Sequence, residues 1–213
     1  MKKGFTLAEI LVSLGLIGVV AALTLPNLMD NTVIVQTGPK LAKSVTNFEQ
    51  ANISLLQTYN SDSLIDTGLI ANSNNLAYNE EYANKLTEFM RVSPMDVYEP
   101  FENDLLMTKD GLVYSIKTGD FEGDSKFRHK YQVGELTVDI NGPAKPNLDA
   151  SDIFYFAIMD DGSLIPYGSK LYSDVYQDED LYWVNSCAKE TVPTSPENCA
   201  GHIFENNMEV LYK

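Results

Sequence analysis

Hydrophobic and polar positions are distributed differently in successive parts of the chain. An almost unbroken apolar run covers the 21 residues from Phe5 to Leu25. The polar residues within it are Thr6, Glu9, Ser13 and Thr24. As a helix rising about 1.5 Å per residue, this run would be about 32 Å long, close to the thickness of a bilayer's hydrocarbon core. We therefore predict a transmembrane helix over residues 5–25.

Periodic apolar positions follow this run. Between Lys40 and Tyr59 one stripe recurs at spacings of three or four residues, and it consists of Leu41, Val45, Phe48, Asn52, Leu55, Leu56 and Tyr59. This spacing predicts an amphipathic helix that packs against a core, and we assign residues 26–59 to an extramembrane helix. Pro26 predicts a kink or a loosened turn. Gly38-Pro39 predicts a break or a fresh helix start.

Strand patterns begin near residue 105, after a Ser-, Asn- and Asp-rich loop (60–79) and a short helix (80–90). The segments 105–108 and 112–116 flank Asp110-Gly111 and predict a hairpin. Further strands are predicted at 133–140, 153–158 and 163–166, with a charged loop at 121–130, and 203–212 is expected to return as a strand or a helical turn. Pro166 predicts that the strand at 163–166 ends there or lies at a sheet edge. The predicted fold class is α+β, with a long N-terminal helix and a small antiparallel sheet in a head spanning residues 60–213.

Composition limits the function. The chain has 30 Asp and Glu residues against 15 Lys and Arg, a net charge of −15. Removing residues 1–4 would delete two lysines and leave 13 basic residues, a net charge of −17. Nucleic-acid binding needs clustered Lys and Arg, so we expect no direct nucleic-acid binding. The sequence has no Ser-His-Asp order, phosphate loop or metal-ligand cluster typical of an enzyme, so we expect no catalytic activity.

Glu9 is the unusual residue of the apolar run. A carboxylate deep in a membrane costs about 2.5–3.5 kcal/mol unless it is paired. A cleaved secretory signal has a shorter apolar region, and a plain membrane anchor has no use for a carboxylate. If the chain were cut between Gly4 and Phe5, the new α-amino group of Phe5 would lie four residues from Glu9 and could neutralise it, within one chain or between neighbouring chains.

The segment Gly4-Phe5-Thr6-Leu7-Ala8-Glu9, preceded by Lys2-Lys3 and followed by Pro26, resembles the prepilin motif of type IV pilins and type II secretion pseudopilins. The resemblance covers about the first 30 residues. It implies that residues 1–4 are a leader, that a prepilin peptidase cuts after Gly4 and methylates the Phe5 nitrogen, and that Glu9 pairs with the N-terminus of an adjacent subunit.

The resemblance also implies partners and location. The expected partners are the prepilin peptidase, other pilin or pseudopilin subunits and the lipid of the inner membrane. The two leader lysines favour a cytoplasmic leader and an extracytoplasmic head, which later joins a periplasmic or extracellular filament. We favour a pseudopilin of a type II secretion-like system. The alternatives are a type IV pilus pilin for adhesion or motility, and a membrane-tethered extracytoplasmic binding domain that never polymerises.

The loop from Asp139 to Asp152 is the candidate metal site. Ca²⁺ prefers carboxylate, amide and carbonyl oxygens, which Asp139, Asn141, Asn147 and Asp152, with Asp149, could supply. Major pseudopilins carry a calcium site in a comparable loop, which is what the resemblance adds. The alternative, which we favour, is a loop whose Asp and Asn side chains cap their own backbone.

Cys187 and Cys199 enclose a short segment near the C-terminus. In an exported domain, two cysteines favour one disulfide, and many pilins fasten this region in the same way. The alternative is a pair of free buried thiols. A zinc site is disfavoured because His202 alone cannot complete a ligand set and His129 lies far away in sequence.

Overall fold

The fold was analysed in a computed structural model that describes residues 6–70, 77–102, 105–119, 132–177, 182–185, 187 and 195–208, with only the backbone of residues 24–35 and 176. The chain divides into two compact units, residues 1–36 and 37–213. In order, the elements are α1 (Leu7–Tyr59), β1 (Ala77–Tyr78), α2 (Glu80–Phe89), β2 (Val92–Met95), β3 (Leu105–Thr108), β4 (Val113–Thr118), β5 (Gln132–Asp139), β6 (Ile153–Met159), β7 (Leu164–Pro166), α3 (Lys170–Tyr176), η2 (Trp183–Asn185), η3 (Pro196–Asn198) and α4 (Cys199–Glu205). This confirms the α+β class.

The predicted break at Gly38-Pro39 is wrong, because α1 is helical from Leu7 to Tyr59. A packing contact explains the glycine there. A Cβ at position 38 would lie 1.8 Å from the carbonyl oxygen of Met208, so the backbone of the C-terminal turn occupies the space of a side chain. Pro39 removes one hydrogen-bond donor from the helix. Burial of the following turns, with Leu41 fully buried and Val45 nearly so, favours the helix despite this loss.

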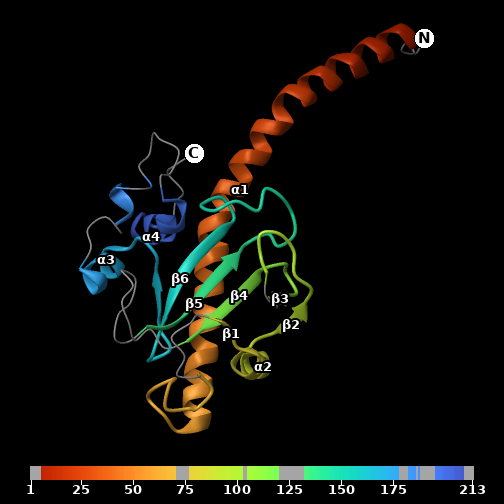
Figure 1. Cartoon of the computed structure of the whole chain (residues 1–213). Coiled ribbons are helices and arrows are strands. Elements are labelled where there is room, and N and C mark those ends of the chain that lie inside the picture. Colours follow the sequence, from red (N-terminus) through yellow and green to blue (C-terminus); the bar gives the residue numbers. More distant parts are fainter. Residues whose placement is uncertain are drawn as a thin grey trace. The chain divides into compact units, whose positions relative to one another are not determined.

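Within the described residues the sheet has seven antiparallel strands in the order β2-β3-β4-β5-β6-β7, with β1 paired to β4 (Figure 1). The hairpin between β3 and β4 turns at Lys109–Gly111, where Gly111 has a φ of +86°. Such a positive φ favours glycine over residues with a Cβ. Among the described strands β7 is the last of the sheet, so Pro166 lies at an edge there, where its missing N–H breaks no ladder.

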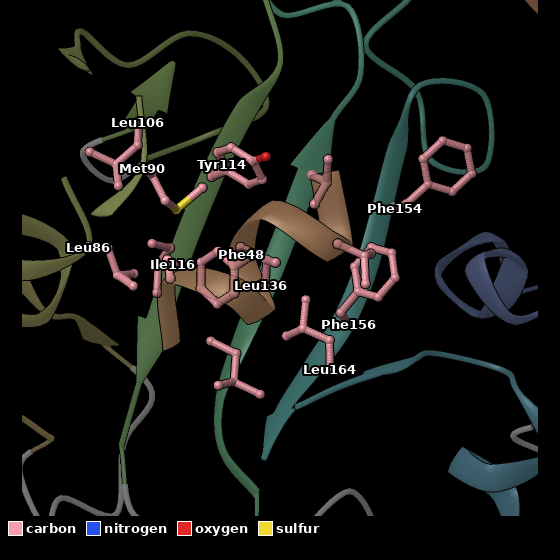
Figure 2. Packing of buried hydrophobic residues seen from close by; sticks show 14 of the residues in the cluster. Phe48, Leu86, Met90, Leu106, Tyr114, Ile116, Leu136, Phe154, Phe156 and Leu164 are labelled. Carbon is pink, nitrogen blue, oxygen red and sulfur yellow. The ribbon is translucent and has the colours of Figure 1, made fainter. Parts of the chain in front are cut away.

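The second half of α1 lies across one face of this sheet (Figure 1). Five apolar stripe residues meet inward-facing strand residues in one hydrophobic core, and they are Leu41, Val45, Phe48, Leu55 and Leu56. The ring centroids of Phe48 and Tyr114 are 6.1 Å apart in this core (Figure 2), whereas Tyr59 at the end of the stripe is 38% exposed. Asn52 is fully buried within the stripe because both ends of its amide are used. It accepts a hydrogen bond from the Tyr82 hydroxyl at 2.6 Å and donates to the Gly162 carbonyl at 2.9 Å. Asn52 thus joins α1 to α2 and to the β6–β7 turn.

A smaller cluster lies on the opposite face of β6. It combines Ala157 and Met159 with Ile165 of β7 and Tyr172 of α3. Alternation along β6 explains the two clusters, since Phe154, Phe156 and Ile158 belong to the α1 side. Tyr172 belongs to α3, which is capped at its start by Ser169, whose side chain accepts the Tyr172 backbone N–H.

Other expectations have mixed outcomes. The predicted helix at 80–90 corresponds to α2, with Asn79 as its N-cap. The predicted final element at 203–212 was placed too late, because α4 spans Cys199–Glu205; residues 209–213 lie outside the described part. The predicted charged loop at 121–130 also lies outside the described residues.

Candidate functional site

Thr6 and Glu9 form a reciprocal cap at the start of α1. The Thr6 backbone N–H donates to Glu9 Oε2 at 2.8 Å, and the Thr6 hydroxyl donates to the same oxygen at 2.9 Å. The Glu9 backbone N–H donates to Thr6 Oγ1 at 3.3 Å. This is a capping box, which satisfies N–H groups that have no partner inside the helix. It engages one carboxylate oxygen, and Oε1 accepts no hydrogen bond within the described residues.

Glu9 stands among exposed apolar side chains. The large hydrophobic residues of this part of α1 are 49–77% exposed, and they are Leu7, Ile10, Leu11, Val12, Leu14, Leu16, Ile17, Val19, Val20 and Leu23. Residues 4–39 contain no Lys, Arg or His, so this stretch offers the Glu9 carboxylate no cationic side chain. The cationic side chains that flank this stretch in sequence are Lys3 and Lys40, and a cut after Gly4 would remove Lys3 and create an α-amino group at Phe5.

The structure tests neither the processing residues nor the topology of the N-terminal segment. Gly4 and Phe5 lie outside the described residues, so cleavage and methylation stay predictions. In the described part of the chain, no helix meets both the length and the apolarity required of a membrane span.

The loop between β5 and β6 is held by two buried carboxylates. Asp139 Oδ1 accepts the backbone N–H groups of Asn141 at 2.9 Å and Gly142 at 2.8 Å. Asp152 accepts the backbone N–H groups of Asn147 at 2.9 Å and Leu148 at 2.7 Å, one on each oxygen. Side-chain carboxylates thus cap backbone N–H groups of their own loop, which is the arrangement that the sequence analysis favoured over a calcium site.

Tyr98 also binds one of these carboxylates. The sequence analysis did not identify it. Its hydroxyl donates to Asp139 Oδ2 at 2.7 Å across a separation of 41 residues. Burial raises the pKa of the Asp139 carboxyl and the Asp152 charge adds to the rise, whereas the hydrogen bonds from Asn141, Tyr98 and Gly142 oppose it. No local sequence signal marks Tyr98, because the contact depends on the path of the chain between β2 and β3.

The predicted calcium ligands lie in this one loop. The Oδ1 atoms of Asn141 and Asn147 are buried without a hydrogen-bond partner, and such oxygens suit a cation. However, each oxygen of Asp139 and Asp152 already accepts a hydrogen bond, and Asp149 accepts one from Tyr155. Within the described ranges, no three His, Cys, Asp or Glu side chains gather as a metal site. Calcium binding therefore stays a prediction.

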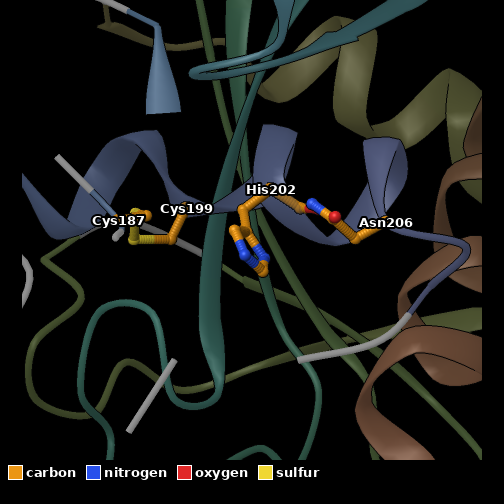
Figure 3. Close-up of a disulfide and its surroundings, with 4 residues drawn as sticks. All are labelled: Cys187, Cys199, His202 and Asn206. Carbon is orange, nitrogen blue, oxygen red and sulfur yellow. A yellow bond between two sulfur atoms is a disulfide. The ribbon is translucent and has the colours of Figure 1, made fainter. Parts of the chain in front are cut away.

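Cys187 and Cys199 are joined in a disulfide with their Cα atoms 5.6 Å apart, and both are fully buried (Figure 3). The bond attaches the segment after η2 to the first turn of α4. His202 follows on α4 and packs edge-on against Trp183, with ring centroids 4.4 Å apart. Burial lowers the pKa of His202. His202 is itself buried, and the absence of a zinc site at this residue stays a prediction.

Residues 1–25 match the family model of the prokaryotic N-terminal methylation motif, the signature of type IV pilins and pseudopilins. This confirms the resemblance for the N-terminal segment and supports a pilin-like or pseudopilin precursor. The motif implies membrane insertion of the N-terminal segment, processing by a prepilin peptidase and assembly with other pilin subunits. No curated protein and no solved structure matches the chain.

Proposed function

From the N-terminal methylation motif, we propose that this chain is a prepilin-type filament subunit that is cut after Gly4, methylated at the Phe5 nitrogen and polymerised. The match over residues 1–25 carries the proposal. The start of α1 supports it, because Glu9 is exposed in an apolar helix with no cationic side chain in residues 4–39.

Assembly would place the Glu9 carboxylate beside the ammonium of a neighbouring subunit. In an apolar filament core an unpaired charge of either sign is strongly disfavoured. Pairing the carboxylate with the ammonium offsets the cost of burying each charge. The capping box favours this geometry, since Thr6 holds Oε2 at the start of the helix and leaves Oε1 able to accept. The same pairing would tend to set the axial stagger between neighbouring helices.

Within this class we propose a pseudopilin that serves protein secretion in a type II secretion-like system. The support is a compact head in which a loop held by Asp139 and Asp152 joins two neighbouring strands. A type IV pilus subunit is the second candidate, favoured by the same motif.

The decisive experiment is intact mass and N-terminal sequencing of the protein taken from membranes of its own host. We expect a chain that begins at N-methylated Phe5. A matched Gly4→Leu variant should keep its leader and begin at Met1, because the peptidase would meet a bulky residue at the cleavage position. A wild-type chain that begins at Met1, or that is cut after the apolar run, would overturn the proposal.

Calcium binding by the β5–β6 loop is tested separately. If the ion binds, calcium but not magnesium should raise the thermal unfolding midpoint, and paired Asn141→Ala and Asn147→Ala substitutions should remove the increase. The self-capped loop instead predicts no response to either ion.

A further inference from the structure

A groove of about 650 Å³ opens beside the second half of α1. Its walls are the Lys43–Ser54 face of α1, the segment Phe89–Val92 after α2, and the β3–β4 turn at Thr108–Asp110. Register explains why the last two walls meet, since Val92 pairs with Thr108 at one corner of the sheet. We call it the cationic groove.

The cationic groove has the opposite charge to the molecule as a whole. Three of its residues are cationic, Lys43, Arg91 and Lys109, in a chain with a net charge of −15. Lys43 forms an ion pair with Asp110 across the groove. Arg91 and Lys109 are exposed, and neither forms an ion pair within the described ranges. Phe89, 37% exposed, adds an apolar surface beside them.

A loop of complementary character follows α1. In the segment Ser61–Gly68, which we call the acidic loop, Asp62 and Asp66 are exposed on either side of Ile65, whose exposed fraction is 43%. Leu64 is fully buried and anchors the loop to the core.

The acidic loop is held firmly in place by the β6–β7 turn. The Leu64 N–H donates to the Asp160 carbonyl at 2.8 Å, while Ser63 Oγ and the Ile65 N–H donate to Asp160 Oδ1 at 2.7 and 3.1 Å. Because these bonds are already made, little ordering remains to be done when the loop binds another surface.

We propose that the cationic groove of one subunit receives the acidic loop of a second copy of this chain, so that Arg91 and Lys109 face Asp62 and Asp66 while Ile65 packs on Phe89. The proposal rests on the proposed function, because it describes a contact between heads in the polymer. It adds a specific surface to the pairing of helices in the filament core.

Charge and symmetry together point to a second copy as the occupant. Heads of such acidic chains repel one another, so close packing needs local pairs of opposite sign. A helical polymer also repeats a heterologous contact, in which two different patches of the same chain meet. The cationic groove and the acidic loop are two such patches, with matching numbers of unpaired charges and one exposed apolar side chain each.

Charge reversal in the full chain, expressed in its own host, tests the contact. The groove variant carries Arg91→Glu and Lys109→Glu, and the loop variant carries Asp62→Lys and Asp66→Lys. Each should lower the filament fraction, relative to membrane-bound monomer, by about tenfold or more, and the fourfold combination should restore it to within about threefold of wild type. Lys117→Glu with Lys145→Glu, and Asp96→Lys with Glu102→Lys, are controls of matched charge outside both surfaces.

Each outcome decides the proposal. If the groove variant polymerises as the wild type does, the contact is wrong while the proposed function stands. If the fourfold variant assembles no better than the two parents, the groove binds some other acidic partner and the proposal is overturned. If processed wild-type protein forms no polymer at all, the contact and the filament function both fall. Unchanged thermal midpoints in all variants would exclude misfolding as the cause.

Discussion

Gly38 is a residue whose identity is explained by a neighbour 170 positions away along the chain. Alanine would favour the helix by about 1 kcal/mol at an open position. Here its Cβ would overlap the Met208 carbonyl oxygen, at 1.8 Å, and a backbone atom cannot swing aside as a flexible side chain can. The clash therefore outweighs the propensity.

We predict that Gly38→Ala lowers the free energy of unfolding by about 2 kcal/mol, because a backbone clash lies at the upper end of the usual overpacking cost of about 1–3 kcal/mol and the gain in propensity offsets about 1 kcal/mol of it. Urea unfolding of the detergent-solubilised chain measures it. Gly18→Ala is the control, because nothing lies within 4 Å of the Cβ that it adds. An equally stable or stabilised Gly38→Ala chain would show that the C-terminal turn is not packed against α1 as described.

A second residue-scale prediction concerns pH. The Lys43 ammonium and the Thr108 hydroxyl lower the pKa of Asp110 to about 2 from its ordinary value of 3.8. A lowered folded-state pKa means that the stabilisation is present above about pH 4 and is lost as the pH falls toward about 2. Both side chains are about half exposed, so solvent screening limits the effect to about 1 kcal/mol or less.

The measurement is the difference in unfolding free energy between wild type and Asp110→Asn across that pH window. The difference should shrink as the pH falls, and about 1 M salt should reduce it at every pH. A difference that grows at low pH would contradict the assignment of Asp110 as the stabilised anion.

At the scale of elements, the disulfide attaches the segment after η2 to the first turn of α4. Its cysteines are 12 residues apart, and closing a loop of this length restricts the unfolded chain by about 2–3 kcal/mol. We predict that the Cys187→Ala, Cys199→Ala double variant is less stable by about this amount, as measured by urea unfolding. The same loss should follow reduction of the wild type, and a reductant should leave the double variant unchanged. No difference between oxidised and reduced wild type would contradict the prediction.

Elements with a strong local pattern could be predicted, and those defined by distant partners could not. The helix that carries the stripe from Leu41 to Tyr59, and the apolar strand at Ile153–Ile158, could each be predicted from the local sequence pattern alone. In contrast, β1 and β2 are two and four residues long, and β2 contains Pro94, which disfavours a strand. Pairing with β4 and β3 defines them as strands. The break expected at Gly38-Pro39 failed for the same reason, since the packing of Met208 is not a local signal.

The candidate site follows the same division. Thr6 and Glu9 lie three residues apart, so the motif that contains them could be recognised from sequence alone. The hydrogen bond from Tyr98 to Asp139 joins residues 41 positions apart, and those from the acidic loop to Asp160 join residues 97 and 95 positions apart. Their importance is visible only once the sheet brings them together.

At the scale of the whole molecule, the acidic head opposes assembly and the apolar N-terminal segment favours it. Copies carrying a net charge of −15 repel one another in water, whereas exposed apolar side chains on α1 favour association. Removing the leader raises the negative charge to −17 and creates one cation, the Phe5 α-amino group, close to Glu9 in sequence. Processing would thus supply the counter-charge at the point where the apolar surfaces associate.

Substitutions at Glu9 separate its charge from its role as a helix cap. Glu9→Gln keeps an oxygen that can accept from Thr6, because glutamine also serves in a capping box, but it carries no charge. Glu9→Ala removes both. If pairing with an ammonium drives assembly, both variants should insert into the membrane normally, and both should lose filament incorporation almost completely. Fractionation of membranes and sheared filaments measures the two steps separately. If Glu9→Gln instead assembled as the wild type does while Glu9→Ala did not, Glu9 would act as a cap that starts α1, and the contacts of the head would have to supply the specificity of assembly.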